Sequence, residues 1–144
     1  DGPERPYLEK WVECKALQSI VRMTGAIGPD EVWSEYVNSD VLVMPTLQDN
    51  WPLVVPEAMS CGLAVLLSDR AGSGPDLLVE GENGYLFDPM RPEGLATLMA
   101  RYIADPTIAA RHGKRSLELV SEFTPGHAAQ RIVEIVDDVH NGLL

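Results

Sequence analysis

Two short runs of uninterrupted apolar residues, 41–44 and 64–67, most constrain the fold of this chain. A strand that is apolar at every position has no face for solvent, which is typical of a parallel sheet covered on both sides. Between the runs, the sequence predicts a short helix closed by Gly62 as a left-handed cap. Parallel strands need such a crossover, which is right-handed. The pattern therefore predicts a doubly wound α/β layer with a parallel sheet.

Helical and strand periods alternate along the rest of the chain. We expect a strand over residues 19–24, a helix that begins at Pro29, a small strand over 85–87, and a helical tail with breaks at Pro106 and Pro125. The buried positions predicted for the first two helices are Leu8, Trp11, Val12 and Ala16, followed by Val32, Tyr36 and Val37. These stripes have the spacing of one helical face.

The helical tail carries two further apolar stripes and all three histidines. The stripes are Leu95, Leu98, Met99, Tyr102 and Ile103, and then Ala129, Ile132, Val133, Val136 and Val139. Their helical spacing predicts core or interface positions. We interpret His112, His127 and His140 as surface or capping residues of this tail.

Length and charge limit the classes of function. The 144 residues fit one domain, and 45% hydrophobic content suffices for a packed core. The net charge of −11 disfavours nucleic acid and anionic lipid as partners. No apolar run approaches the roughly 18 residues of a membrane span, and no signal segment opens the chain. Cys14 and Cys61 have neither metal-ligand spacing nor a paired framework, so we expect reduced thiols and a cytoplasmic location.

The segment 49–62, Asp-Asn-Trp-Pro-Leu-Val-Val-Pro-Glu-Ala-Met-Ser-Cys-Gly, is the candidate ligand site. It follows a predicted strand, where ligands of such sheets bind. Each of the carboxylates of Asp49 and Glu57 can accept two vicinal hydroxyl groups, and the helix N-terminus at Leu53 and Val54 can hold a phosphate. This arrangement suits a nucleotide-sugar, with Asp49 toward the sugar and Glu57 toward the ribose.

A simpler interpretation uses the same residues. Asp49 and Asn50 are also common turn and capping residues, and Glu57 is a favourable charge for a first helical turn. Spacing alone leaves both interpretations open.

This segment resembles the signature of the retaining GT-B glycosyltransferases of family 4, in which a Glu, seven residues and a second Glu precede an Ala-Met-Ala-Cys-Gly run. The resemblance extends through residues 1–5, 23–25, 39–45, 68–69, 83–84 and 87–89, in the order of the family's motifs. Two departures are Asp49 in place of the commoner Glu, and Asn50-Trp51-Pro52 in place of Gly-Phe-Gly. Because Pro52 has no N–H, the phosphate would rely on Leu53 and Val54.

The resemblance implies a Rossmann-like sheet with a helical tail, the C-terminal half of a GT-B fold. Residues 1–144 would form the nucleotide-sugar (donor) binding domain, apparently without its first strand and the N-terminal acceptor domain. The base of the donor would lie against the backbone of Gly25, Ala26 and Ile27, and Asn50 and Trp51 would also line the donor.

The implied reaction is transfer of a sugar from the nucleotide-sugar to a glycan or lipid-linked acceptor, with retention of configuration and without metal or other cofactor. By resemblance, the Arg and Lys that hold the leaving phosphate precede the turn at residues 1–5. We therefore assign no catalytic residue to this chain and expect it to be inactive alone. The missing domain would bind the acceptor and could bring the protein to a membrane.

Two other functions stay open at this point. A nucleotide-sugar epimerase of the same fold would bind the same donor without transfer, although residues 57–62 favour the transferase. A non-catalytic binding or scaffold domain is the second alternative.

Overall fold

The computed structural model describes residues 1–143 and separates into two compact units, Asp1–Glu35 and Tyr36–Leu144. The first unit contains helix α1 (Arg5–Cys14) and most of helix α2 (Pro29–Val37), which ends in the second unit. The predicted start of a helix at Pro29 is confirmed.

The first unit corrects two predictions. Residues 19–24 form turns and irregular chain instead of a strand, and Ile20 is 77% exposed. A strand needs a neighbour for its backbone groups, so β-branched side chains alone do not create one. Ala16 lies beyond the end of α1 with a left-handed φ of 52°, and Val12 is the only buried residue of the helix. The predicted stripe of α1 is therefore mostly exposed.

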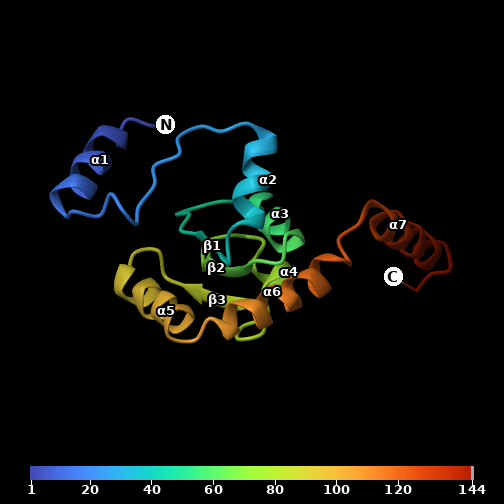
Figure 1. Cartoon of the computed structure of the whole chain (residues 1–144). Helices are drawn as coiled ribbons and strands as arrows, with labels where there is room; N and C mark the ends of the chain where they lie inside the picture. Colours follow the sequence, from blue (N-terminus) through green and yellow to red (C-terminus); the bar gives the residue numbers. More distant parts are fainter. Residues whose placement is uncertain (144) are drawn as a thin grey trace. The chain divides into compact units, whose positions relative to one another are not determined.

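The second unit is built on a three-stranded parallel sheet. Strands β1 (Val41–Met44), β2 (Ala64–Ser68) and β3 (Gly84–Phe87) lie in the order β1-β2-β3 (Figure 1). Helix α3 (Val54–Ser60) connects β1 to β2, and helix α4 (Gly74–Leu77) lies between β2 and β3. The predicted Rossmann-like α/β fold is confirmed. Gly62 closes the α3 segment with a φ of 79°, also as predicted.

The core lies on both faces of β2, which is buried at every position. One cluster contains Val55, Met59, Val65, Leu67, Ala71 and Leu77, and the other contains Ala64, Leu66, Phe87, Tyr102 and Ala109. In contrast, β1 is half-buried at all four positions. The predicted coverage is thus complete for β2 and partial for β1, because β1 forms one edge of the described sheet.

The tail contains three helices, α5 (Pro92–Ala104), α6 (Thr107–Val120) and α7 (Pro125–His140). Two predictions about burial are wrong here and in α2, because His112 is fully buried on α6 and Val37 of α2 is 67% exposed. Ile103 of α5 is 79% exposed, so it does not belong to the core, and its prediction as an interface residue stays a prediction. His127 and His140 are exposed, as expected for the first and last turns of α7. No helix among residues 1–143 is both long and apolar enough to cross a bilayer.

Candidate functional site

The segment after β1 is held against the loop after β2. Asp49 pairs with Ala71 in an isolated parallel bridge, and the Gly72 N–H donates to the Asp49 carbonyl at 2.8 Å. A Cβ on Gly72 would lie 2.0 Å from the Asn50 carbonyl oxygen, so only glycine permits this approach. Both loops follow the carboxyl ends of adjacent parallel strands, which is where ligands of open α/β sheets bind.

Asp49 fixes the turn with one of its two carboxylate oxygens. Its Oδ1 accepts the Trp51 N–H at 3.1 Å, and the side chain is half-buried. Among the described residues, no donor contacts Oδ2. The turn role that the sequence allowed for Asp49 is therefore present, and the second oxygen is not used in it.

Trp51 anchors the same turn through its indole. The Nε1–H donates to Asp76 Oδ2 at 3.0 Å, and the ring lies 6.3 Å from the Phe123 ring, measured between centroids. Sequence patterns do not indicate these partners, because Asp76 and Phe123 are distant from Trp51 along the chain. Asn50, next to Trp51, is exposed.

Glu57 lies on α3, half-buried, with one oxygen engaged. The Tyr36 hydroxyl donates to Glu57 Oε2 at 3.1 Å. Burial, together with this hydrogen bond to a carboxylate, raises the pKa of Tyr36 to about 12, so Tyr36 remains a donor at neutral pH. Sequence reasoning placed Tyr36 in the core and missed this role. Oε1 of Glu57 has no donor within the part of the chain that the structure describes.

The start of α3 lies between these two carboxylates in the sequence. Leu53 is the N-cap residue and Val54 the first helical residue. Neither amide donates to an acceptor among residues 1–143, whereas the Val55 N–H donates to the Pro52 carbonyl at 3.2 Å. Leu53 is 65% exposed. These two amides are therefore unengaged donors, four and five residues after Asp49.

Gly25, Ala26 and Ile27 belong to the first unit, whereas Asp49 and Glu57 belong to the second. Gly25 has a φ of 75°, and the Ala26 N–H donates to Asp1 Oδ2 at 2.9 Å. The other oxygen of Asp1 accepts from Arg5 at 2.6 Å. The chain bends at Ala26, whose amide is already engaged.

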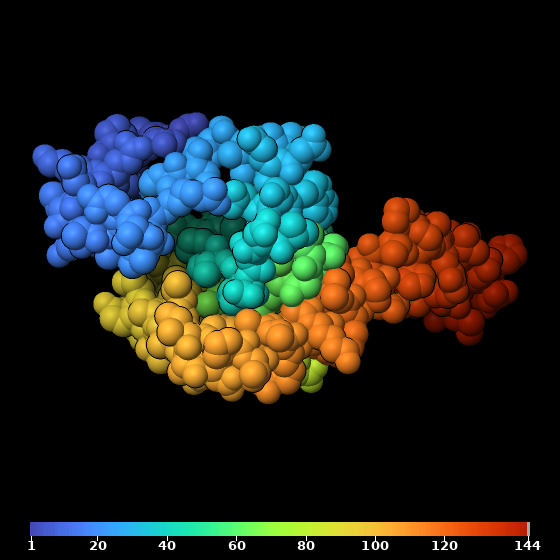
Figure 2. All heavy atoms as spheres, viewed as in Figure 1, coloured from blue at the N-terminus to red at the C-terminus, as the bar shows by residue number. Residues whose placement is uncertain are grey.

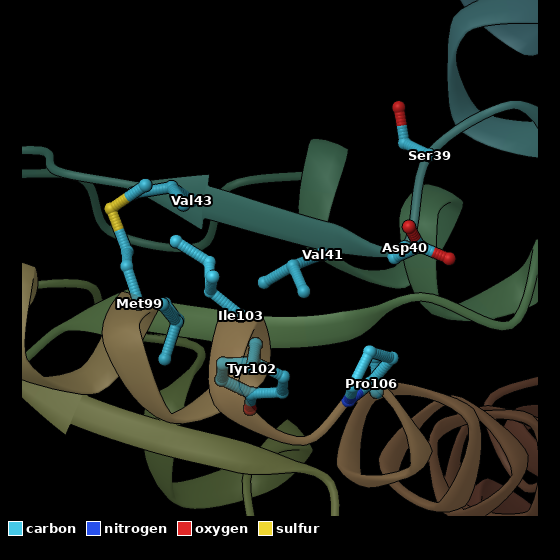
Figure 3. A pocket seen from close by; sticks show the side chains of 10 residues that line it. Ser39, Asp40, Val41, Val43, Met99, Tyr102, Ile103 and Pro106 are labelled. Atoms are coloured by element: carbon cyan, nitrogen blue, oxygen red, sulfur yellow. The ribbon is translucent and has the colours of Figure 1, made fainter.

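Two hollows in the second unit differ from this site in chemistry. A cavity of about 480 Å³ lies between β1 and α5, where Val41, Val43, Met99 and Ile103 line it and Asp40 stands at its rim (Figure 3). Its lining is mainly aliphatic, so it offers little to bind a phosphate or a sugar. A second hollow of about 590 Å³ lies beside Trp51, with Phe123, His127 and Arg131 among its lining residues.

No group of three or more His, Cys, Asp or Glu side chains in residues 1–143 is placed to hold a metal ion. Cys14 and Cys61 are free thiols. Burial raises the pKa of Cys61, which disfavours a reactive thiolate there.

Residues 1–118 match the family model of group 1 glycosyl transferases. The chain belongs to this glycosyltransferase family. It is 34% identical over 126 residues to the sulfoquinovosyl transferase of Arabidopsis thaliana, covering 85% of this chain and 24% of that protein. It is 31% identical over 133 residues to a lipopolysaccharide core biosynthesis mannosyltransferase of Rhizobium leguminosarum bv. viciae, covering 92% and 36%. This glycosyltransferase chain therefore spans about a quarter to a third of these relatives' lengths.

Solved structures of GT-B proteins have the same fold. The sucrose-phosphate synthase of Thermosynechococcus elongatus superimposes with a TM-score of 0.79 at 28% identity, covering 98% of this chain and 35% of that one. An Anabaena protein solved in complex with UDP gives a TM-score of 0.77 at 22% identity, covering 94% and 38%. The second likeness shows the fold alone. The glycosyltransferase chain thus has the fold of a GT-B C-terminal domain.

Proposed function

We propose that this chain forms the nucleotide-sugar donor site of a retaining glycosyltransferase. The observation that carries the proposal is the pair of half-buried carboxylates, Asp49 and Glu57, on either side of two unengaged amides in the sequence after β1. Family membership supports glycosyl transfer, and the structural neighbour solved with UDP supports a nucleotide. The acceptor, a glycan or a lipid-linked sugar, would be bound by a further domain of the complete enzyme.

Each group has one task in this proposal. The free Oδ2 of Asp49 accepts hydrogen bonds from the transferred sugar, and the amides of Leu53 and Val54 donate to the pyrophosphate. Glu57 accepts the ribose hydroxyls through Oε1 and the remaining lone pair of Oε2, since Tyr36 uses only one lone pair. Tyr36 therefore positions the carboxylate without closing it to the ligand.

The rest of the proposed donor site lies outside this turn. The backbone of Gly25, Ala26 and Ile27 would contact the base, although Asp1 holds the Ala26 amide and the Gly25 carbonyl accepts a long hydrogen bond from the Thr24 hydroxyl. Asn50 and Trp51 would form the wall of the site nearest Asp49. The proposed reaction needs no metal and no other cofactor, and we propose a cytoplasmic enzyme, held at a membrane only through its other domain. The 144-residue chain assayed alone would transfer no sugar.

Glu57→Ala tests the ribose assignment in the complete enzyme. Loss of hydrogen bonds to a charged acceptor should weaken nucleotide-sugar binding by about 1.5–3 kcal/mol, and Glu57→Gln should lose less. Isothermal titration calorimetry measures both. Glu93→Ala is the matched control, because Glu93 is also an acidic residue in the first turn of a helix, α5, but is exposed there. Equal affinity of the wild type and Glu57→Ala would contradict the assignment.

Asp49→Asn tests the other end of the donor. The variant keeps an oxygen for the Trp51 N–H, so the turn should survive. Turnover should fall while affinity for the bare nucleoside diphosphate stays nearly unchanged, because the lost contact belongs to the transferred sugar. Product analysis with a labelled donor separates transfer from epimerisation. If the variant loses equally with the sugar nucleotide and with the bare nucleoside diphosphate, the assignment of Asp49 to the transferred sugar is wrong.

A further inference from the structure

The loops after the three strands carry little positive charge. Residues 45–53 contain no Lys or Arg, residues 69–73 contain Arg70, and residues 88–91 contain Arg91, which pairs with Asp88 at 3.5 Å. Asp49, Asp69 and Asp76 lie in or beside the same loops. The carboxyl end of the described sheet is therefore acidic, with Arg70 as its one cation that has no ion pair among the described residues.

The backbone of Arg70 is fixed close to the turn that holds Asp49. Its N–H donates to Ser68 Oγ at 3.1 Å, and the next residue, Ala71, bridges to Asp49. The loop continues into Gly72, whose N–H donates to the Asp49 carbonyl. Arg70 thus follows β2 at the site edge, and its side chain is exposed.

The side chain of Arg70 is not used to stabilise the fold through an ion pair. Other arginines of the chain do pair with carboxylates, namely Arg5, Arg22, Arg91, Arg115 and Arg131. The chain has 22 acidic residues and 11 basic ones, so acidic partners are abundant. A guanidinium left without one beside a ligand site is available to an anionic ligand.

We propose that Arg70 forms an ion pair with the diphosphate of the nucleotide-sugar donor. This inference rests on the proposed function and adds a donor-binding residue to it. The planar guanidinium can donate two parallel hydrogen bonds to phosphate oxygens, and it offsets the repulsion between the diphosphate and the carboxylates of Asp49 and Asp69. The Leu53 and Val54 amides supply neutral donors to the same group, while Arg70 supplies the charge.

The experiment compares nucleotides that differ by one phosphate, using the complete enzyme in calorimetry. UDP, GDP and ADP are titrated first, and each diphosphate that binds is compared with its monophosphate. Arg70→Ala should lower diphosphate affinity about tenfold and monophosphate affinity much less, with Arg70→Lys between wild type and Arg70→Ala. The advantage of the wild type should shrink as salt rises.

Arg111→Ala is the control for net charge. Arg111 is exposed on α6 and has no ion pair among the described residues, so its loss removes the same charge away from the strand-end loops. An unchanged ratio of diphosphate to monophosphate affinity in Arg70→Ala, or the same loss in Arg111→Ala, would overturn the role of Arg70. If that ratio is unchanged while Glu57→Ala weakens donor binding, only the role assigned to Arg70 is wrong and the proposed donor site stands. If the wild type binds none of the diphosphates, both proposals fall.

Discussion

Helices α6 and α7 follow each other in the chain, and both are amphipathic, yet they differ in what they bury. The buried residues of α6 are small or polar: Ala109, His112, Gly113 and Ser116. Helix α7 carries the larger aliphatic residues Ile132, Val133, Val136 and Val139, and none of its residues is buried. Figure 2 shows the atoms of α7, in red, uncovered along the visible side. Hydropathy alone would rank the two helices in the opposite order.

Close fit to neighbouring elements explains the burial of α6. A Cβ on Gly113 would lie 1.9 Å from the Gly62 carbonyl oxygen, so the helix meets the segment after α3 backbone to backbone. One residue earlier on α6, His112 Nδ1 lies 3.0 Å from the Tyr102 hydroxyl of α5. Small residues permit a close approach, and a paired polar residue is tolerated inside it. The aliphatic stripe of α7 has no such partner among the described residues.

Gly113→Ala should disrupt the packing of α6 against the segment after α3. Of the predictions in this comparison, it has the largest expected effect on the free energy of unfolding. In an open helix this change stabilises by up to about 1 kcal/mol, but here the new methyl overlaps a backbone oxygen. We expect a loss of about 3 kcal/mol or more in the free energy of unfolding, measured by urea denaturation. Gly94→Ala in α5 is the control, because a Cβ there meets nothing within 4 Å. Equal stability of the two variants would show that α6 does not pack this closely.

The pH dependence of stability tests the burial of His112 on α6. Burial is the main cause that lowers its pKa, Arg111 adds to the effect, and the Gly81 carbonyl opposes it. Although that carbonyl acts on the pKa, Nε2 has no hydrogen bond of good geometry within the described residues. The unfolded chain, with a histidine pKa of about 6.5, therefore binds the proton more readily than the folded chain. The contribution of the neutral His112 to the free energy of unfolding is fully present above that pH, and it should fall as the pH drops below it.

The measurement is the urea midpoint between pH 8 and pH 5.5. His112→Gln should be less stable at pH 8, by about 1–3 kcal/mol, and should lose less on acidification. Tyr102→Phe keeps the ring and removes the hydroxyl, which separates the hydrogen bond from packing. If the urea midpoint changes equally with pH in the wild type and in His112→Gln, His112 is not a buried, neutral residue.

Substitution in the aliphatic stripe of α7 has the smallest expected effect on the free energy of unfolding. Ile132 is 63% exposed and Leu66 of β2 is fully buried, so the two residues form a matched pair of similar size. Ile132→Ala should change the free energy of unfolding by less than about 0.5 kcal/mol, whereas Leu66→Ala should cost about 2–5 kcal/mol. If both variants lose comparable stability, α7 is covered in solution. Sedimentation of the wild type would then show whether copies of the chain associate through it, as an exposed apolar patch favours.

Elements whose pattern is local could be predicted from the sequence alone. The apolar runs of β1 and β2, the glycine cap at Gly62 and the proline that starts α2 were each predicted, because period, φ preference and missing N–H groups act within a few residues. The order of those elements predicted the parallel sheet. The position of Asp49 after β1 followed from that order.

Tertiary structure decided what depends on a neighbour distant in sequence. Residues 19–24 have the composition of a strand but form none, because a strand requires a partner edge. His112 is polar and yet fully buried, and the Tyr102 hydroxyl partners its Nδ1. The Tyr36 hydroxyl on Glu57 and the Asp76 carboxylate on Trp51 join residues 21 and 25 positions apart. Side-chain type sets which bonds a residue can make, whereas only the folded chain brings the two groups within bonding distance.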